Sequence, residues 1–248
     1  FKQPGCVVIK HANPCGAAVS DNVYDSFLKA LNADRLSAFG GIVALNRECT
    51  TEIAKELSDF FIEIIVAPSF TKESLEIFSS KKNLRVIELV SLDGFNDKTS
   101  VRNINGGLLL QETDTFTVDA KSLKIVTDSK ISPNTYGTIE FGWTVLKYIK
   151  SNGILIVKNN ATLGVGAGQV SRIDSVDIAI TKASGDIKDS ILLSDAFFPF
   201  RDSIDKIAKS GIRCIIQPGG SQRDQEVIDA CNEYSIAMAC TGASCFNH

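Results

Sequence analysis

The sequence predicts an α/β protein whose strands lie mostly inside a sheet that helices cover. Short runs of Val and Ile recur along the chain, helical patterns separate several of these runs, and 44% of the 248 residues are hydrophobic. Continuous apolar runs of this kind are typical of strands that are buried on both faces. Their alternation with helices is typical of α/β folds, in which crossovers between parallel strands are right-handed.

The expected strands are the apolar runs themselves. In chain order they are CVVI (6–9), GIVAL (41–45), EIIVA (63–67), LRVIEL (84–89), GILIV (153–157), CIIQ (214–217) and IAMA (236–239). Helices are expected at 51–61, 202–211 and 223–234. The first places Ile53, Leu57 and Phe60 on one face, and the second ends on Gly211, as helices commonly do.

The polar segment 91–138 carries several Gly and Pro residues and only weak strand signals. We expect it to connect two α/β lobes, with some antiparallel pairing around 108–118. The first lobe, together with the start of this connection, is expected at 1–130, and the second at 131–248. Because the chain starts with Phe1 rather than Met, and a strand-like run follows almost at once, we expect a piece of a longer protein whose first lobe is incomplete.

Composition and charge narrow the classes of partner. The net charge of -3 gives no electrostatic reason to expect nucleic acid or an anionic membrane. No apolar run approaches the roughly 18–20 residues that span a bilayer. Seven cysteines without a C-x-x-C pair indicate reduced thiols and a cytoplasmic setting. With only two histidines and no paired cysteines, we expect no zinc site.

The stretch VVIKHANPCGAA ends an apolar run with the adjacent residues Lys10 and His11. Successive strand residues point to opposite faces, so both side chains serve one site only if the chain leaves the strand here. Asn13, Pro14 and Gly16 are expected to supply that exit. A lysine ammonium beside an imidazole favours the neutral imidazole, which suits a general base. The alternative is a solvated lysine beside a hydrogen-bonded loop histidine.

Two glycine-rich stretches are candidate binding loops. In the first, Gly164, Gly166 and Gly168 follow an expected strand, where free backbone N–H groups would suit a phosphate. The G-x-G-x-G spacing matches neither the dinucleotide fingerprint nor the P-loop, and close packing of a strand on a helix is the alternative. In the second, QPGGSQRD, Ser221 is a candidate helix N-cap.

The segment SDAFFPFRD, residues 194–202, groups phenylalanines around Pro199 between acidic residues and Arg201. Aromatic faces next to charged groups suit a flat heterocycle, and a buried aromatic corner is the alternative. The segment NPCGAA contains a Pro-Cys pair as zinc deaminases do. Because the second Cys and the H-x-E of those enzymes are absent from the sequence, we exclude that chemistry.

Taken together, these segments closely resemble the transformylase half of the bifunctional purine biosynthesis family. The members of that family join 5-aminoimidazole-4-carboxamide ribotide (AICAR) transformylase to inosine monophosphate (IMP) cyclohydrolase. The segments that carry the resemblance are IKHANPCGAA, DRLSAFGGIVALNRE, IEIIVAPS, NGGLL, YIKSNGILIVKNN, GVGAGQVSR, SDAFFPFRD and QPGGSQRDQEVIDAC. They cover nearly the whole chain, and the KHANPCG and SDAFFPFRD segments are the most specific. The resemblance implies two cytidine-deaminase-like three-layer α/β/α lobes without zinc.

The resemblance also implies a reaction in purine (IMP) biosynthesis. The formyl group of the co-substrate 10-formyltetrahydrofolate moves to the 5-amino group of AICAR, and no transition metal takes part. That amine is a poor nucleophile because the ring and the carboxamide withdraw its lone pair. Its attack therefore needs a proton acceptor and a group that stabilises the developing oxyanion. By resemblance, His11 accepts the proton, Lys10 stabilises the transition state, and Asn152 is a further catalytic residue.

The resemblance places further residues against the two substrates. Those expected to contact the ribotide are Gly40, Glu63, Asn152, Arg172 and Phe197. Those expected to face the folate are Ile173, Asp202, Ser221 and Gln222. Arg172 suits a phosphate or a carboxamide, because a guanidinium fork binds such groups through two hydrogen bonds. The family site lies at a dimer interface, so the implied partners are AICAR, the folate and a second copy of the chain, with neither nucleic acid nor membrane.

Two departures from the family bear on activity. Its Arg-Tyr-Gly-x-Asn-Pro-His-Gln segment and its cyclohydrolase domain are expected outside this chain. In the tail TGASCFNH, Ser244 stands where the family usually has an arginine that contacts the ribotide, although Phe246 and His248 match. The loss of guanidinium donors weakens the expected ribotide site. One hypothesis is an active transformylase within a longer chain. The other is a truncated or degenerate, non-catalytic relative that keeps the fold and the dimer interface. A nucleotide-binding oxidoreductase built on the glycine run has little support.

Overall fold

A mixed sheet of eleven strands runs through the computed structural model, which describes residues 1–90 and 99–248. In spatial order the strands are β5 (Arg85–Glu88), β4 (Ile62–Ala67), β3 (Gly41–Leu45), β1 (Gly5–Lys10), β2 (Asn13–Val19), β10 (Ala161–Gly166), β9 (Ile154–Lys158), β11 (Ile191–Ser194), β12 (Cys214–Gln217), β13 (Ala237–Cys240) and β8 (Lys124–Ile125). Strands β3, β4 and β5 are parallel, as are β11, β12 and β13, and the other neighbours are antiparallel. The expected α/β class is confirmed as a mixed α/β fold.

Helices flank this sheet, and side-chain caps fix several of their starts. In chain order the helices are α1 (Val23–Ala33), α2 (Arg35–Ala38), α3 (Thr51–Ser58), α4 (Lys72–Ser79), α5 (Tyr136–Leu146), α6 (Arg172–Lys182), α7 (Asp202–Ser210) and α8 (Asp224–Glu233). Asn22 caps α1 by accepting a hydrogen bond from the N–H of Asp25. Ser171 caps α6 in the same way through the N–H of Asp174. This cap sets α6 to begin at Arg172.

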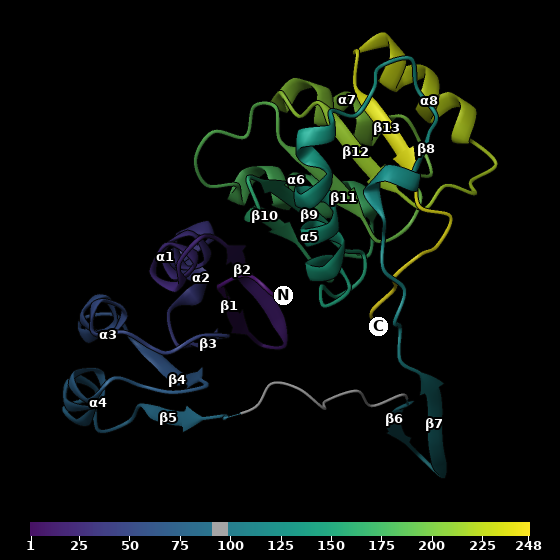
Figure 1. The fold of residues 1–248 in the computed structure, drawn as a ribbon. Coiled ribbons are helices and arrows are strands. Elements are labelled where there is room, and N and C mark those ends of the chain that lie inside the picture. Colours follow the sequence, from purple (N-terminus) through teal and green to yellow (C-terminus); the bar gives the residue numbers. More distant parts are fainter. Residues whose placement is uncertain (91–98) are drawn as a thin grey trace.

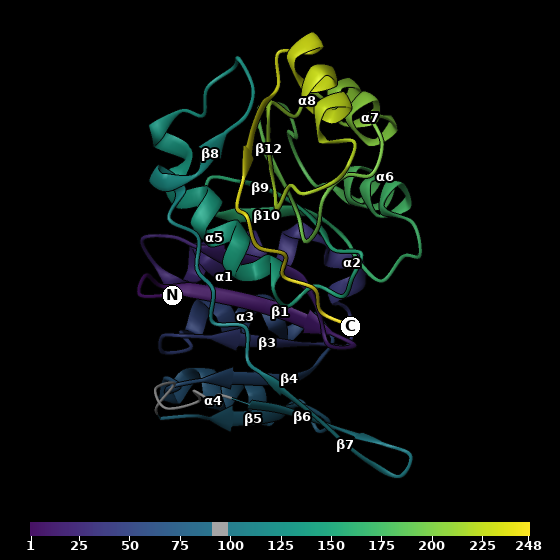
Figure 2. The same ribbon diagram turned by 90° about the vertical axis from the view of Figure 1, so that its right-hand side faces the viewer.

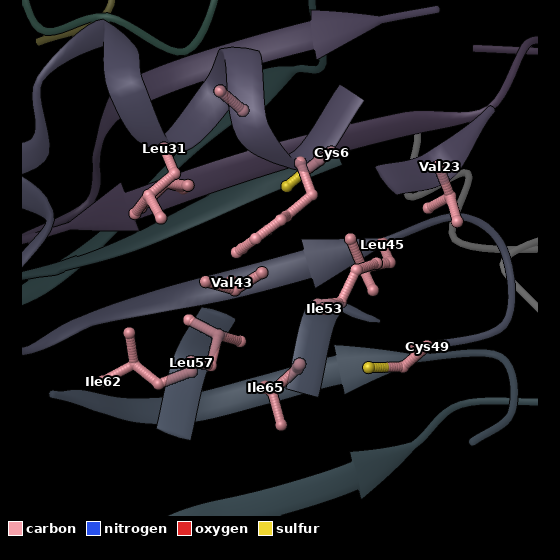
Figure 3. Close-up of a cluster of buried hydrophobic side chains, with 14 of the residues drawn as sticks. Cys6, Val23, Leu31, Val43, Leu45, Cys49, Ile53, Leu57, Ile62 and Ile65 are labelled. Atoms are coloured by element: carbon pink, nitrogen blue, oxygen red, sulfur yellow. The ribbon is translucent and has the colours of Figure 1, made fainter. Parts of the chain in front are cut away.

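In the N-terminal half, helices α1 to α4 lie on one side of strands β1 to β5 (Figure 1). Side chains alternate along β1, so that Cys6 and Val8 are buried in the core on the helix side. Figure 3 shows Leu31 of α1 and Leu57 of α3 in this core together with Val43 of β3. The N-terminal half therefore has its own buried core between its helices and its strands.

In the C-terminal half, helices cover both faces of the sheet. Ile154 and Ile156 of β9 belong to a buried cluster with residues of α6, α7 and α8. Leu155 and Val157 of the same strand belong to a second buried cluster with residues of α5. Because successive strand residues point to opposite faces, these two clusters lie on opposite sides of the sheet.

The two halves of the sheet meet at β2 and β10. Ala18 of β2 pairs with Ala161 of β10 in antiparallel register. The buried Thr162 adds two hydrogen bonds, because its Oγ1 accepts from the N–H of Ala17 at 2.9 Å and donates to the carbonyl of Ala17 at 3.2 Å. A side chain thus supplies bonds that a strand backbone would otherwise make.

The expected strands are all confirmed, each with its ends within one residue of the predicted run. The expected helices are confirmed as α3, α7 and α8, although α3 ends at Ser58 rather than at residue 61. The elements that were not predicted are the strands β2, β8, β10 and β11 and the helices α1, α2, α4, α5 and α6.

The expected connecting segment contains a two-stranded antiparallel ribbon of β6 (Thr99–Ile104) and β7 (Gly107–Glu112). The predicted pairing is therefore confirmed for part of 108–118, since β7 ends at Glu112. The first part of the segment, residues 91–98, lies outside the described residues. Figure 2 shows the ribbon extending away from the main sheet. Division into lobes at residues 130 and 131 stays a prediction.

Candidate active site

The adjacent Lys10 and His11 lie at the tip of the hairpin between β1 and β2. Lys10 pairs with Asn13, and His11 and Ala12 form the two-residue turn, with φ angles of 52° and 62°. Two positive φ values are typical of the primed turns that close tight hairpins. The chain does leave the strand after Lys10, but the predicted exit is wrong. Asn13, Pro14 and Gly16 belong to the returning strand β2.

Four of the expected site residues gather at this end of the N-terminal half of the sheet. The ammonium of Lys10 donates a hydrogen bond to the carbonyl of Phe39 at 2.6 Å, and His11 is exposed. Gly40 follows, with a φ of 73° that favours glycine. Glu63 is exposed on β4, whose register places it next to the start of β3. One end of the strands β1, β3 and β4 thus carries Lys10, His11, Gly40 and Glu63.

Five other expected residues line one cavity in the C-terminal half. Its volume is about 410 Å³, and Asn152, Arg172, Ile173, Phe197 and Asp202 all contribute to its wall. They come from the loop before β9, the first turn of α6, the loop after β11 and the start of α7. The sequence segments KSNG, QVSR and SDAFFPFRD therefore meet at one place, although their residues are far apart in the chain.

Arg172 is nearly buried and makes a network of hydrogen bonds inside the protein. Its Nη1 donates to Asp195 Oδ1 at 2.6 Å and to Ser194 Oγ at 2.9 Å, and its Nη2 donates to Asn152 Oδ1 at 2.7 Å. Asp195 is fully buried. The charge of the guanidinium is therefore balanced within the chain before any ligand arrives.

The carboxamide of Asn152 is held from several directions. Its Nδ2 donates to the carbonyls of Gln169 at 2.9 Å and Val170 at 3.2 Å, and its Oδ1 accepts from Arg172. Ser175 of α6 donates to the backbone carbonyl of Asn152 at 2.8 Å. Both amide hydrogens of this side chain are thus used within the protein, which leaves one lone pair of its oxygen for a ligand.

The aromatic segment SDAFFPFRD fits both of its interpretations, at different residues. Phe198 is fully buried and joins the core under α6, α7 and α8. Phe197 and Phe200 are 39% and 49% exposed, and both line the cavity together with Phe246 from the C-terminal tail. A buried aromatic corner therefore supports two exposed rings that face the cavity.

The glycine run packs a strand against a helix and is not a phosphate loop. Gly164 and Gly166 lie in β10, and a Cβ on Gly166 would come within 1.9 Å of the carbonyl oxygen of Ser175 in α6. The N–H of Gly168 donates to the carbonyl of Lys150 at 2.9 Å. The phosphate-cradle hypothesis is therefore wrong for this run, and the packing alternative is right for Gly164 and Gly166.

Ser221 and Gln222, expected at the folate, do not line the cavity. Ser221 is not the N-cap of α8, because Arg223 occupies that position and Ser221 Oγ accepts from the N–H of Arg223 at 3.1 Å. Their turn nevertheless adjoins the cavity, since the Arg223 guanidinium lies 5.0 Å from the centre of the Phe200 ring. The N-cap prediction is thus wrong, and the contact with folate stays a prediction.

The C-terminal tail contributes to the cavity wall. Ser244 is exposed, and Phe246, two residues later, lines the cavity wall. Asn247 fixes the tail, because its N–H donates to Ser151 Oγ at 3.0 Å and its carbonyl accepts from the N–H of Ser151 at 3.1 Å. The tail is thereby attached to the loop that carries Asn152.

A hydrogen bond links the hairpin to this loop. The N–H of Lys150 donates to Asn13 Oδ1 at 3.0 Å. The cavity wall contains neither Lys10 nor His11. The structure thus brings the site residues together in two groups, one on the hairpin edge and one around the cavity, with Asn13 between them.

Sequence reasoning missed the roles of Asp195, Asn13 and Ser151. Each is an ordinary polar residue inside a recognised motif, and its importance depends on partners that lie far away in the chain. The position of Asp195 directly after the apolar run ILLS is the signal that could have drawn attention to it. A carboxylate that follows a buried strand must find donors or remain exposed.

The cysteines are not part of the site. All seven are free thiols, and burial raises the pKa of Cys49, Cys231 and Cys245 to about 12. Thiols of this kind are inert because the thiolate is the reactive form. Among residues 1–90 and 99–248, no cluster of three or more His, Cys, Asp or Glu is arranged to hold a metal. Within the same residues, none of the helices has the length and hydropathy of a membrane-spanning segment.

Comparison with known proteins places the chain in a family. The model described as AICARFT/IMPCHase bienzyme matches residues 1–182. The bifunctional purine biosynthesis proteins PurH of Aquifex aeolicus, Anoxybacillus flavithermus and Persephonella marina are 49%, 45% and 46% identical over 249, 248 and 252 residues. These matches cover 99–100% of this chain but 48% of each relative, so the chain spans about half the length of the curated relatives it matches.

Among solved structures, an apo crystal structure of dCMP deaminase from the cyanophage S-TIM5 matches with 17% identity and a TM-score of 0.32. That match covers 44% of this chain and 98% of the deaminase chain. The family assignment rests on the sequence matches, which extend along the whole chain. The chain belongs to the AICARFT/IMPCHase bienzyme family.

Proposed function

We propose that this chain is the transformylase part of a bifunctional purine biosynthesis protein and that it transfers a formyl group from 10-formyltetrahydrofolate to AICAR. One observation carries the proposal. Asn152, Arg172 and Phe197, expected at the ribotide, and Ile173 and Asp202, expected at the folate, line a single cavity. Its volume of about 410 Å³ lies in the usual range for small-molecule sites. Its exposed phenylalanine rings offer flat apolar faces to a heterocycle.

The surroundings of Arg172 favour a neutral ligand group. Asp195 already balances the guanidinium charge, so Arg172 offers oriented N–H donors rather than a net positive charge. A phosphate dianion gains most from an unpaired cation, whereas a carboxamide needs only directed hydrogen bonds. We therefore assign Arg172 to the carboxamide of AICAR rather than to its phosphate.

In the proposed reaction, the 5-amino nitrogen of AICAR attacks the formyl carbon and a new carbon–nitrogen bond forms. The carbonyl oxygen takes up negative charge, and its collapse breaks the bond to N10 of the folate, which receives a proton. His11 accepts the proton of the attacking amine, and the Lys10 ammonium stabilises the oxyanion. The hydrogen bond of Lys10 to Phe39 holds the ammonium beside the turn that carries His11.

We propose that two copies of the chain assemble the complete site, because neither Lys10 nor His11 lines the cavity. The β6–β7 ribbon supports a contact between copies. Val101, Leu108 and Leu110 share one face of it and are 54%, 63% and 72% exposed. Exposed apolar side chains grouped on a projecting element are typical of association surfaces.

The proposal includes two cytidine-deaminase-like three-layer α/β/α lobes without zinc, at 1–130 and 131–248, in a cytoplasmic protein. The helices on both faces of the C-terminal half support this architecture for the second lobe. In the first lobe, helices α1 to α4 provide one of the two expected helix layers. The AICAR and folate sites belong to both lobes, since the hairpin comes from the first and the cavity from the second.

The test is a formyl-transfer assay of the full-length protein that carries this chain, with AICAR and 10-formyltetrahydrofolate as substrates. We expect a loss of 10-formyltetrahydrofolate that depends on AICAR. Absence of that loss would contradict the proposed activity. Calorimetric titration with AICAR then separates the alternatives, because binding without transfer identifies a non-catalytic relative. The observation that favours this second function is the exposed Ser244, which lacks the guanidinium donors expected at its position.

A further inference from the structure

A buried carboxylate outside the cavity wall organises the loop that carries Asn152. Asp195 directly follows β11 and is fully buried. Its Oδ1 accepts from Arg172 at 2.6 Å, and its Oδ2 accepts from Ser151 Oγ at 2.6 Å and from the N–H of Gly153 at 2.9 Å. The family resemblance does not place Asp195 in contact with either substrate.

These contacts enclose Asn152 on both sides. Ser151 and Gly153 are its two chain neighbours, and one carboxylate oxygen holds both of them. The other oxygen holds Arg172, which in turn donates to Asn152 Oδ1 at 2.7 Å. Backbone bonds add to this, because the N–H of Asp195 donates to the carbonyl of Gly153 at 3.1 Å. Asp195 therefore fixes the position of Asn152 through three routes.

Burying the ion pair between Arg172 and Asp195 costs free energy. Removing a carboxylate and a guanidinium from water carries a desolvation penalty that their attraction often fails to exceed. Well-packed apolar side chains of similar volume are often as stable as a buried ion pair. Here the pair has side-chain exposures of 7% for Arg172 and 0% for Asp195. Orientation of the two cavity residues is the gain that the geometry offers in return.

We propose that Asp195 is the positioning residue of the cavity, acting on ligands only through Asn152 and Arg172. It holds the Asn152 carboxamide in place, and it balances the charge of Arg172 so that the cavity prefers a neutral polar group to an anion. This inference rests on the proposed function for its AICAR measurements. Its prediction about anions requires no ribotide.

The test uses Asp195→Asn in the full-length protein, because this change keeps the shape of the side chain and removes its charge. We expect the dissociation constant for AICAR, measured by calorimetry, to rise at least tenfold, because Arg172 and Asn152 lose their fixed orientation. We also expect the variant to bind inorganic phosphate at least tenfold more tightly than the wild type, since an unpaired guanidinium then faces the cavity. A purely structural role would not produce this gain.

The matched control is Asp34→Asn, which removes the carboxylate of a half-buried ion pair with Lys182 away from the cavity. It should leave the dissociation constants of AICAR and phosphate unchanged. Asp195→Asn with an intact fold and with both constants unchanged would overturn the inference. Failure of the wild type to bind AICAR would instead contradict the proposed function, and the phosphate measurement would still test the inference.

A second variant covers the case in which Asp195→Asn does not fold. The double change Arg172→Gln and Asp195→Asn leaves no unpaired charge in the interior, so the protein should keep its fold by circular dichroism. It should lose AICAR affinity without gaining phosphate affinity. AICAR binding of wild-type strength in this double variant would refute the role of Asp195 as a positioning residue.

Discussion

His11 occupies a backbone position that few residues tolerate. Its φ of 52° lies in the left-handed region, where His and Asn are enriched among non-glycine residues. The turn leaves the imidazole exposed beside Lys10, and the hydrogen bond between Lys150 and Asn13 ties the base of the turn to the loop of Asn152. The hairpin thus presents a candidate proton acceptor on a fixed backbone.

Replacing His11 by Asn tests its role with little disturbance of the turn, since Asn also adopts this conformation. We expect formyl transfer to slow by roughly 10²–10⁴-fold, the usual contribution of a general base. Turnover at saturating AICAR is the measurement, and thermal unfolding should remain as in the wild type. The matched control is His248→Asn, which alters the other histidine of the chain. Near-normal turnover of His11→Asn would exclude it as the base.

For single residues, the sequence predicted which residues belong to the site better than it predicted their contacts. The residues Asn152, Arg172 and Phe197 were singled out by motif, and the fold brings them to one cavity. The motifs could not predict that the Arg172 side chain donates three hydrogen bonds to residues of its own chain. Those partners are set by how β9, β11 and α6 pack, which no local pattern contains.

The contact between β10 and α6 determines where the first turn of α6 lies. Gly166 allows the strand backbone to approach Ser175 so closely that any side chain would collide with it. Arg172 begins the same helix, and Ser175 donates to the carbonyl of Asn152. Close packing at one glycine therefore places both Arg172 and its neighbour Asn152.

Gly166→Ala should therefore destabilise the protein. Its Cβ would lie 1.9 Å from the Ser175 oxygen, so strand and helix must separate, and overpacking of this kind typically costs roughly 1–3 kcal/mol. Urea unfolding measures the loss. The matched control is Gly137→Ala on the exposed side of α5, where the new Cβ approaches nothing closer than 4.0 Å. That change should stabilise the protein by up to about 1 kcal/mol, because Ala favours helices. Equal stabilities would contradict the packing role.

Element prediction succeeded where burial and periodicity agree and failed where they conflict. Short apolar strands such as β9 and β12 were found because both faces are buried. Strand β2 was missed because Asn13, Pro14 and Gly16 are typical of a turn. Helix α5 was missed because it is apolar on most sides and so shows no clear helical stripe. Tertiary packing overrides local preference in both cases.

At the scale of the whole molecule, the β6–β7 ribbon stands out because it carries several exposed apolar side chains. One face of the ribbon carries Arg102 and Leu109, which line a cavity together with the C-terminal tail. The face with Val101, Leu108 and Leu110 therefore points away from the chain's own tail. A two-stranded ribbon has little stability alone in water, so it gains from a partner on that free face.

The double variant Val101→Ser and Leu110→Ser should weaken a dimer built on this face. We expect sedimentation velocity to show monomers at concentrations where the wild type is dimeric. Formyl transfer should fall with dissociation if, as proposed, both copies contribute to the site. Leu75→Ser on α4, where the leucine is 44% exposed, is the matched control and should leave the dimer intact. A dimer unaffected by the double change would place the interface elsewhere.

The seam between β2 and β10 has a consequence for synthesis on the ribosome. Thr162, whose hydroxyl bonds to Ala17, follows it by 145 residues, so β2 is translated long before its neighbour. The nascent N-terminal half meanwhile has an unpaired edge strand, which is a template for pairing with other nascent chains. Pro14 lies in that strand and has no N–H group to donate. The proline that obscured β2 in the sequence thus makes its temporary edge a poor partner for aggregation during translation.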